Sequence, residues 1–294
     1  MPEESPRVVN QVTKTPLAQS TGQSVSLGDR LGATLEAIVI GDRWATHRRG
    51  AADQAWQGGL LRVAQACAEG DRLQPQIWQS HFQGLRDPSA VLINTLPYLW
   101  INADAHGHHR AAVGRWVANL ALEDEVARAC DQLFLVLCRE LGAASANASH
   151  QDFPAGAEDS HAVDLGSVVG RSLDLAAQSQ GQVALALALA HQRGWTAAAI
   201  ALAGGLLGLT QGRASLGAGL RQRWLVGYCA LDCASGSDAP GPDAPGPDAP
   251  GPDPWPGLGD DTLGQIAAAL HRRWAGLGVA PSLDQPAFPL GVRV

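Results

Sequence analysis

Lysine, aromatic side chains and charge in general are scarce in this sequence. Lys14 is the only lysine, aromatic residues make up 5% and charged residues 17% of the 294 residues, and the formal net charge is −7. Proteins that bind nucleic acid or anionic membranes through charge need a basic face, and this composition does not supply one. We therefore expect no nucleic-acid partner and no membrane partner.

Cysteine pairs and long apolar runs are also missing. The five cysteines show no C-x-x-C spacing, and Cys130 and Cys138 fall within one helical pattern, which favours small apolar packing groups in a reducing compartment. The opening residues, MPEESPRVVNQVTKTP, contain no apolar run typical of a signal peptide. The uncharged stretch 194–212 includes Thr196 and Thr210 and falls short of the roughly 20 apolar residues that span a bilayer. These features predict a cytoplasmic protein.

Alanine, leucine and glycine are abundant, and they follow helical patterns. Ser26 is placed to cap a first helix, which we expect to end at Gly41. A proline inside the apolar segment 88–101 predicts a helix that is kinked or ended near Leu96. The run VALALALA, residues 183–190, alternates by twos, but alanine and leucine favour a helix. Further helices are expected over 53–69, 108–119, 122–141, 163–230 and 261–276, and one beginning at Pro75. The prediction is an all-α protein, a single large bundle of about ten helices.

Four segments follow from the composition along the chain. Residues 1–25 are polar and aperiodic, which predicts a flexible tail. The helical domain covers 26–236. Residues 237–256 are built on DAPGP repeated three times, which predicts a disordered, extended insertion. Residues 257–294 are expected to supply a last helix that completes the domain, followed by a tail.

The stretch HQRGWTAAAIALAGGLLGLTQG, residues 191–212, has glycines at every fourth position: Gly204, Gly208 and Gly212. Each glycine inside a helix costs roughly 1 kcal/mol relative to alanine, yet small residues at this spacing let a second helix approach closely. We therefore expect this helix to pack tightly at the centre of the bundle.

Two polar motifs could hold a metal ion. DAHGHHR contains the side-chain types that bind transition metals, namely those of Asp104, His106, His108 and His109. No partner segment is evident, which favours a polar connection leading into the next helix. In GDDT, 259–262, the carboxylates precede the last helix, and capping of its first turn is favoured over cation binding.

Asp42 and Asp53 lie at the expected end of one helix and the start of the next, where two carboxylates could face a shared cavity. They could equally be solvated, because Asp53 can cap its own helix and Asp42 can pair with a neighbouring arginine. The solvated arrangement is favoured by the residues alone. No G-x-S-x-G motif, phosphate loop or dinucleotide fingerprint is present.

Taken together, the segments over residues 26–276 resemble the ADP-ribosylglycohydrolase family in order and spacing. Members of that all-helical family hold two magnesium ions between an early TDDT motif and a late D-x-D-T motif. GATLEAIVIGD is similar to the family's first apolar helix and places Asp42 at its acidic position. AVLINTLPYLW is similar to a family segment with a proline, and AIALAGGLLGL is similar to the run after the late motif.

The resemblance also shows where this chain departs from the family. The TDDT positions fall on Ala52, Asp53, Gln54 and Ala55, and the D-x-D-T positions fall on Trp195, Thr196, Ala197 and Ala198. Asp42, Asp53 and Gln54 are thus vestigial site candidates, with Asp42 and Asp53 the weak candidates for metal ligands. Trp195, Thr196 and Asn94 are candidates for lining a ligand pocket.

Magnesium needs hard oxygen ligands in a near-octahedral array, and too few remain at these positions. The resemblance therefore implies a divergent member without a metal cofactor, a non-catalytic binding or scaffolding pseudoenzyme for a protein partner or an ADP-ribose-like ligand. One alternative is an active, Mg²⁺-dependent hydrolase of ADP-ribosyl N- or O-glycosidic bonds with an altered metal site. A second is an unrelated helical protein-interaction module, in which 27–41 and 196–212 would lie far apart.

Overall fold

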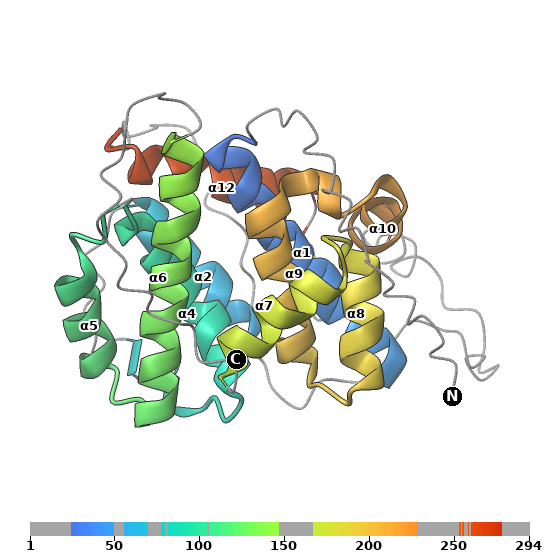
Figure 1. Ribbon diagram of the computed structural model, residues 1–294, viewed down its shortest axis with the longest axis horizontal. Coiled ribbons are helices and arrows are strands. Elements are labelled where there is room, and N and C mark those ends of the chain that lie inside the picture. The colour runs from blue at the N-terminus through green and yellow to red at the C-terminus, as the bar shows by residue number, and fades with distance from the viewer. Residues whose placement is uncertain are drawn as a thin grey trace, which may run out of the picture.

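A computed structural model describes residues 25–49, 56–69, 78–79, 82–104, 106–146, 167–227, 253, 255, 258 and 260–277. Within these ranges the chain forms ten α-helices and no strand, which confirms the all-α prediction (Figure 1). The helices are α1 (Leu27–Arg49), α2 (Gln57–Glu69), α4 (Pro88–Asn102), α5 (Arg110–Asn119), α6 (Asp124–Ala146), α7 (Val168–Gln178), α8 (Val183–Gln192), α9 (Ala197–Gln211), α10 (Ala218–Arg221) and α12 (Asp260–Trp274). A 3₁₀ turn, η1 (Gly212–Ser215), follows α9, and a π-helical turn, η2 (Gln222–Val226), follows α10.

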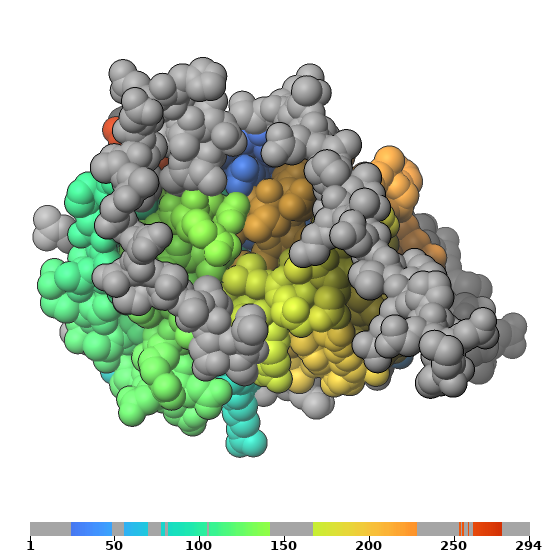
Figure 2. Space-filling model, in the orientation of Figure 1, coloured from blue at the N-terminus to red at the C-terminus, as the bar shows by residue number. Residues whose placement is uncertain are grey.

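Helix α1 is the central element of the bundle. It contacts α8, α9, α10, α12 and both short turns, and every residue from Leu31 to Thr46 is buried. Figure 2 shows it only as a small blue patch between neighbouring segments. Its start is as predicted, because the Ser26 hydroxyl accepts the Asp29 backbone N–H at 3.1 Å.

The predicted end of α1 at Gly41 is wrong, because the helix continues to Arg49. Gly41 serves helix packing instead of helix termination. A Cβ at this position would lie 2.9 Å from the Cα of Ala201 on α9, closer than real Cβ atoms approach. Asp42 consequently lies inside a helix, not at a helix end.

The glycines of α9 pack against α1, which confirms the predicted close approach of a second helix. A Cβ at Gly204 would lie 3.0 Å from the carbonyl oxygen of Ala37, and one at Gly208 would lie 2.4 Å from that of Ala33. Side chains at these positions would force the two backbones apart. The segments 27–41 and 196–212 therefore lie side by side, unlike the separation expected of an unrelated interaction module.

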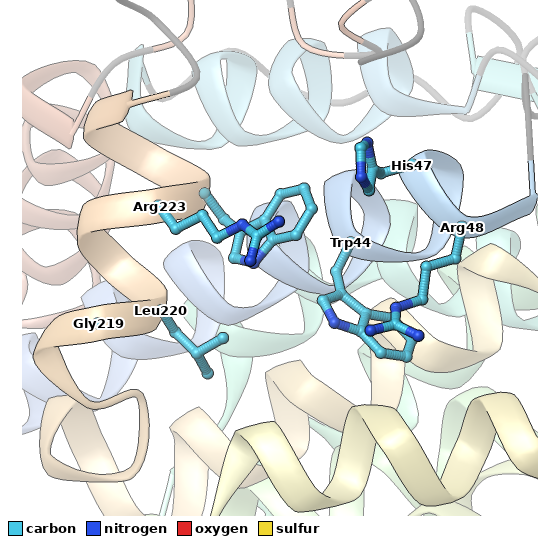
Figure 3. Close-up of a pocket in the computed structure, with 7 residues that line it drawn as sticks. Trp44, His47, Arg48, Gly219, Leu220 and Arg223 are labelled. Carbon is cyan, nitrogen blue, oxygen red and sulfur yellow. The ribbon is translucent and has the colours of Figure 1, made fainter. Parts of the chain in front are cut away.

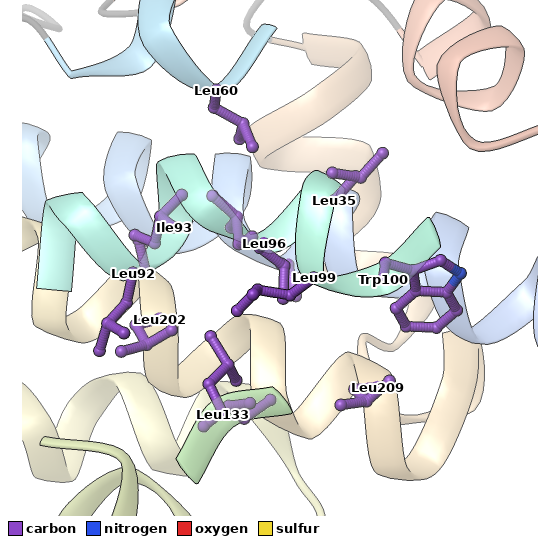
Figure 4. Close-up of a cluster of buried hydrophobic side chains, with 14 of the residues drawn as sticks. Leu35, Leu60, Leu92, Ile93, Leu96, Leu99, Trp100, Leu133, Leu202 and Leu209 are labelled. Atoms are coloured by element: carbon purple, nitrogen blue, oxygen red, sulfur yellow. The ribbon is translucent and has the colours of Figure 1, made fainter. Parts of the chain in front are cut away.

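Of the two predicted outcomes near Leu96, a kink or an end of the helix, the end is wrong, because α4 runs through Pro97 to Asn102. The helix begins with Asp87 as N-cap, whose carboxylate accepts the Ser89 N–H at 2.8 Å. It is buried along nearly its whole length, and Leu92, Leu96 and Leu99 belong to the core that it shares with α6 and α9 (Figure 4). Burial of these apolar side chains offsets the hydrogen bond that proline removes.

Local predictions elsewhere are confirmed. VALALALA lies within α8, and the acidic residues of GDDT lie in the first turn of α12. Cys67, Cys130 and Cys138 are buried free thiols. No helix in the described part of the chain is long and apolar enough to cross a membrane. Several predictions fall outside the described residues. They concern residues 1–24 of the predicted tail 1–25, the starts of the predicted helices at 53 and at Pro75, and most of the DAPGP tract.

The end of the DAPGP tract departs from the predicted disordered insertion. Asp253 and Trp255 are described, and both are packed against the bundle: the Asp253 carboxylate is 1% exposed and Trp255 is 1% exposed. Asp253 occupies the aspartate position of the repeat, and Trp255 departs from it. These two side chains form the contacts with the bundle.

Candidate functional site

Asp42, the acidic position given by the family resemblance, is fully buried on α1. Its Oδ2 accepts two hydrogen bonds of 2.9 Å, one from Gln57 Nε2 on α2 and one from Trp255 Nε1. Its Oδ1 is buried with no hydrogen-bond partner. The expectation of a solvated Asp42 paired with a nearby arginine is thus wrong, because α2 and the segment around Trp255 cover this face of α1.

Burial decides the protonation of this carboxyl. Loss of solvent raises the pKa of Asp42 from its ordinary value of 3.8 to about 6, although the hydrogen bonds from Gln57 and Trp255 lower it. The nearby Asp253 carboxylate adds a smaller upward contribution, and the Arg43 guanidinium a smaller downward one. Asp42 therefore changes charge in mildly acidic solution.

Arg43, the next residue, anchors three segments from its buried position on α1. Its Nε and Nη2 donate to the two carboxylate oxygens of Asp253 at 3.0 and 2.7 Å. Its Nη1 donates to the Trp224 carbonyl at 2.8 Å, and its Nη2 also reaches the carbonyls of Trp255 and Leu258, each at 3.2 Å. A buried guanidinium with this many acceptors fixes η2 and the end of the DAPGP tract onto α1.

Glu36 lies about two turns before Arg43 on the same face of α1 and also anchors two segments to this helix. Both of its carboxylate oxygens are engaged, one by Arg213 Nη2 at 2.7 Å and the other by Arg221 Nε at 2.8 Å. The carboxylate is fully buried. It thereby ties η1 and α10 to α1 and sets the position of the turns that follow.

The late-motif positions lie at the start of α9 and carry no cation ligands. Trp195 is half-buried in the turn between α8 and α9, and Thr196 is the N-cap, accepting the Ala199 N–H at 3.1 Å. Ala197 and Ala198 have no side-chain oxygen to offer. None of these four side chains offers a carboxylate oxygen to a cation.

The remaining candidates are Asn94, Asp53 and Gln54. Asn94 is buried on α4, where its amide lies against Gly59 of α2, and its Oδ1 has no hydrogen-bond partner. Asp53 and Gln54 lie outside the described residues. Among the candidate residues that the structure describes, Asp42 is thus the buried carboxylate within a network.

The donor set does not fit a magnesium centre at the described positions. Both Asp42 hydrogen bonds converge on one oxygen, and the α9 residues supply only a threonine hydroxyl that already caps the helix. Magnesium requires about six oxygen ligands in octahedral geometry. No step involving a metal is therefore assigned to these residues.

The histidine cluster forms a turn. The Asp104 carboxylate accepts the backbone N–H groups of His106 and His108 at 2.7 and 3.2 Å, and these hydrogen bonds lower its pKa although partial burial raises it. The His108 and His109 side chains are 71% and 59% exposed. Throughout the described ranges, no group of three or more His, Cys, Asp or Glu side chains is arranged to hold a metal ion.

A cavity of about 510 Å³ lies on another face of α1, between this helix and the turns after α9 (Figure 3). Residues of α1 form one wall, and residues of α10 and η2 form the other. The principal lining side chains are Trp44, His47, Arg48, Leu220, Arg223 and Trp224. None of the candidate residues from the sequence lines it.

Sequence reasoning missed Arg43, Glu36, Asp253 and Trp255, and it missed the cavity. The available signal was the interruption of DAPGP by PDPWP, where a large indole enters a tract of small residues. Family models, curated proteins and solved structures yield no match to this chain.

Proposed function

We propose that this chain is a non-catalytic binding protein built on an ADP-ribosylglycohydrolase-like arrangement of helices. Its role is to bind an ADP-ribose-like ligand or a protein partner without hydrolysing a bond. The order of the segments is the reason for proposing this family. The burial of Asp42 and its two hydrogen bonds support the loss of catalysis.

The observation that carries the proposal is the engagement of Asp42. Its Oδ2 is held by the Trp255 indole and the Gln57 amide, and the carboxyl has no exposed surface. A carboxylate that binds Mg²⁺ must present oxygen lone pairs to the ion. Here both donors are N–H groups, so the carboxyl acts as a structural acceptor.

The test is an activity assay on the full chain. Release of ADP-ribose from an ADP-ribosylated protein is measured with and without Mg²⁺, and Mg²⁺ binding is measured by isothermal titration calorimetry. We expect no turnover and no heat of Mg²⁺ binding. Because a ligand that binds the folded state raises its stability, Mg²⁺ is also expected to leave the melting temperature unchanged.

The alternative of an active hydrolase with an altered metal site makes the opposite prediction. Measurable turnover that is abolished in the Asp53→Ala variant establishes that alternative and overturns the proposal. Asp42→Asn is the matched variant, because a structural acceptor tolerates the amide whereas a metal ligand does not.

A further inference from the structure

The cavity beside Trp44 combines two cations with two indoles. Arg48 Cζ lies 4.8 Å from the centroid of the Trp44 ring, and Arg223 Cζ lies 5.1 Å from that of Trp224. A guanidinium held over an indole face has fewer conformations to lose when it binds an anion. In Figure 3 the labelled Arg48 and Arg223 side chains extend from opposite walls toward the space between α1 and η2.

This cavity concentrates positive charge in a chain with a net charge of −7. Among the described residues, no carboxylate pairs with Arg48 or Arg223, and none of the lining side chains is acidic. Other arginines near α1, such as Arg43 and Arg213, are engaged by carboxylates. A cleft lined by charge of one sign attracts ligands of the opposite sign.

His47 adds a polar group to the same cavity. Its ring meets the Trp224 ring edge-on, with centroids 5.4 Å apart, and its Nδ1 is buried without a hydrogen-bond partner. The imidazole ring thus forms part of the cavity wall beside the Trp224 indole.

The walls of the cavity are fixed by the buried ion pairs of α1. Arg43 donates to the Trp224 carbonyl, and Glu36 holds Arg221 at the end of α10. Helix α10, which carries Leu220, and η2, which carries Arg223, are therefore held against α1 before any ligand binds. Such preorganisation favours binding because less motion is lost.

We propose that this cavity binds a small organic phosphate that carries a planar ring. The two guanidinium groups donate to phosphate oxygens, for which their planar forks are suited, and the His47 imidazole lies beside them. The Trp44 and Trp224 indoles and Leu220 supply apolar surface for the ring. The volume of about 510 Å³ falls within the usual 300–1,000 Å³ range of small-molecule sites.

An ADP-ribose-like ligand belongs to this chemical class, so the site deepens the proposed binding function, but the evidence for the cavity is separate from the evidence at Asp42. Asp42 and Thr46 are four residues apart and share one face of α1, whereas Trp44, His47 and Arg48 project from a different face. A finding of hydrolase activity would overturn the proposed function and leave this cavity unaffected.

The probe is phenyl phosphate, titrated into the full chain and followed by tryptophan fluorescence and by calorimetry. Inorganic phosphate and phenol, titrated separately, represent the two halves of the probe. For a ligand of this size we expect a Kd of about 1 mM or below. Inorganic phosphate and phenol are each expected to bind at least about tenfold more weakly, because each makes only one set of contacts.

Arg48→Gln and Arg223→Gln are the test variants, and Arg115→Gln on α5 is the matched control. All three arginines are exposed, so each variant is expected to keep the wild-type melting temperature. Loss of either pocket arginine should raise the Kd for phenyl phosphate by at least about tenfold, whereas the control should not change it.

Two results overturn the proposal. The first is absence of phenyl phosphate binding at 10 mM, about ten times the expected Kd. The second is binding that is unchanged in Arg48→Gln and Arg223→Gln. Either result shows that the cavity is not the proposed site. If inorganic phosphate and phenyl phosphate bind with equal affinity, the ring contributes nothing to binding, and the proposal that the ligand carries a planar ring is wrong.

Discussion

The Asp42→Asn variant separates the charge of the buried carboxyl from its shape. The side chain is fully buried, and its Oδ2 accepts from Gln57 and Trp255 at 2.9 Å each. Asparagine has nearly the same size, and its amide oxygen can accept from the same two donors. Its NH₂ group stands where protonated aspartate would carry its own hydrogen. The variant therefore represents the neutral form of Asp42 at every pH.

The magnitude follows from the raised pKa. In the folded protein the pKa of Asp42 is about 6, against 3.8 for an exposed aspartate. The folded state thus binds the proton more tightly than the unfolded chain does. The stability that this confers is complete below pH 3.8 and is lost as the pH rises through about 6. The full loss amounts to about 3 kcal/mol.

The assay is urea unfolding of the wild type and the variant at a series of pH values between about 3 and 8, a range that brackets the two pKa values. All other titrating groups are common to both proteins, so their contributions cancel in the difference. We expect the variant to gain about 3 kcal/mol relative to the wild type across this range, with most of the change between pH 4 and 6. A difference that stays constant with pH would show that Asp42 ionises as freely in the folded state as in the unfolded chain, and would refute the reasoning.

Three further predictions concern the packing around α1, each measured as a free energy of unfolding at neutral pH. Asp253→Asn leaves the buried Arg43 guanidinium uncompensated and should cost about 3–5 kcal/mol. In the control Asp131→Asn both side chains of the ion pair are 43% exposed, so the cost should be less than about 1 kcal/mol. Equal costs would contradict the anchoring role of Arg43. Gly208→Ala should cost about 1–3 kcal/mol, because the added methyl group overpacks the contact with α1. Gly114→Ala, where the added methyl group meets open space, should stabilise the protein by about 0.5–1 kcal/mol. A gain in stability at both glycines would rule out the close approach of α9 to α1. Trp255→Phe removes an indole N–H from a buried carboxylate and should cost about 1–3 kcal/mol, and a neutral effect would show that this hydrogen bond is dispensable.

Short-range features of the fold were accessible from the sequence because their causes lie within one turn of helix. The Ser26 cap, the helical state of VALALALA and the acidic first turn of α12 each depend on neighbouring residues alone. Gly204 and Gly208 also predicted a close helix neighbour, because only the absence of a side chain permits such an approach.

Residues whose role depends on a distant partner were read wrongly. Gly41 has the sequence signature of a helix end, yet its lack of a Cβ serves contact with Ala201. Pro97 has the signature of a helix break, yet α4 continues because its surroundings bury it on nearly every side. In both cases tertiary packing outweighs the local preference.

The sequence by itself determined that this chain is helical and which helix would accept a close neighbour. Tertiary structure alone decided that α1 is that neighbour, that Asp42 is buried, and that Arg43 meets Asp253, 210 residues further along the chain. A helix periodicity is set by hydrogen bonds four residues apart, whereas a buried charge is satisfied by whichever segment the completed fold brings to it.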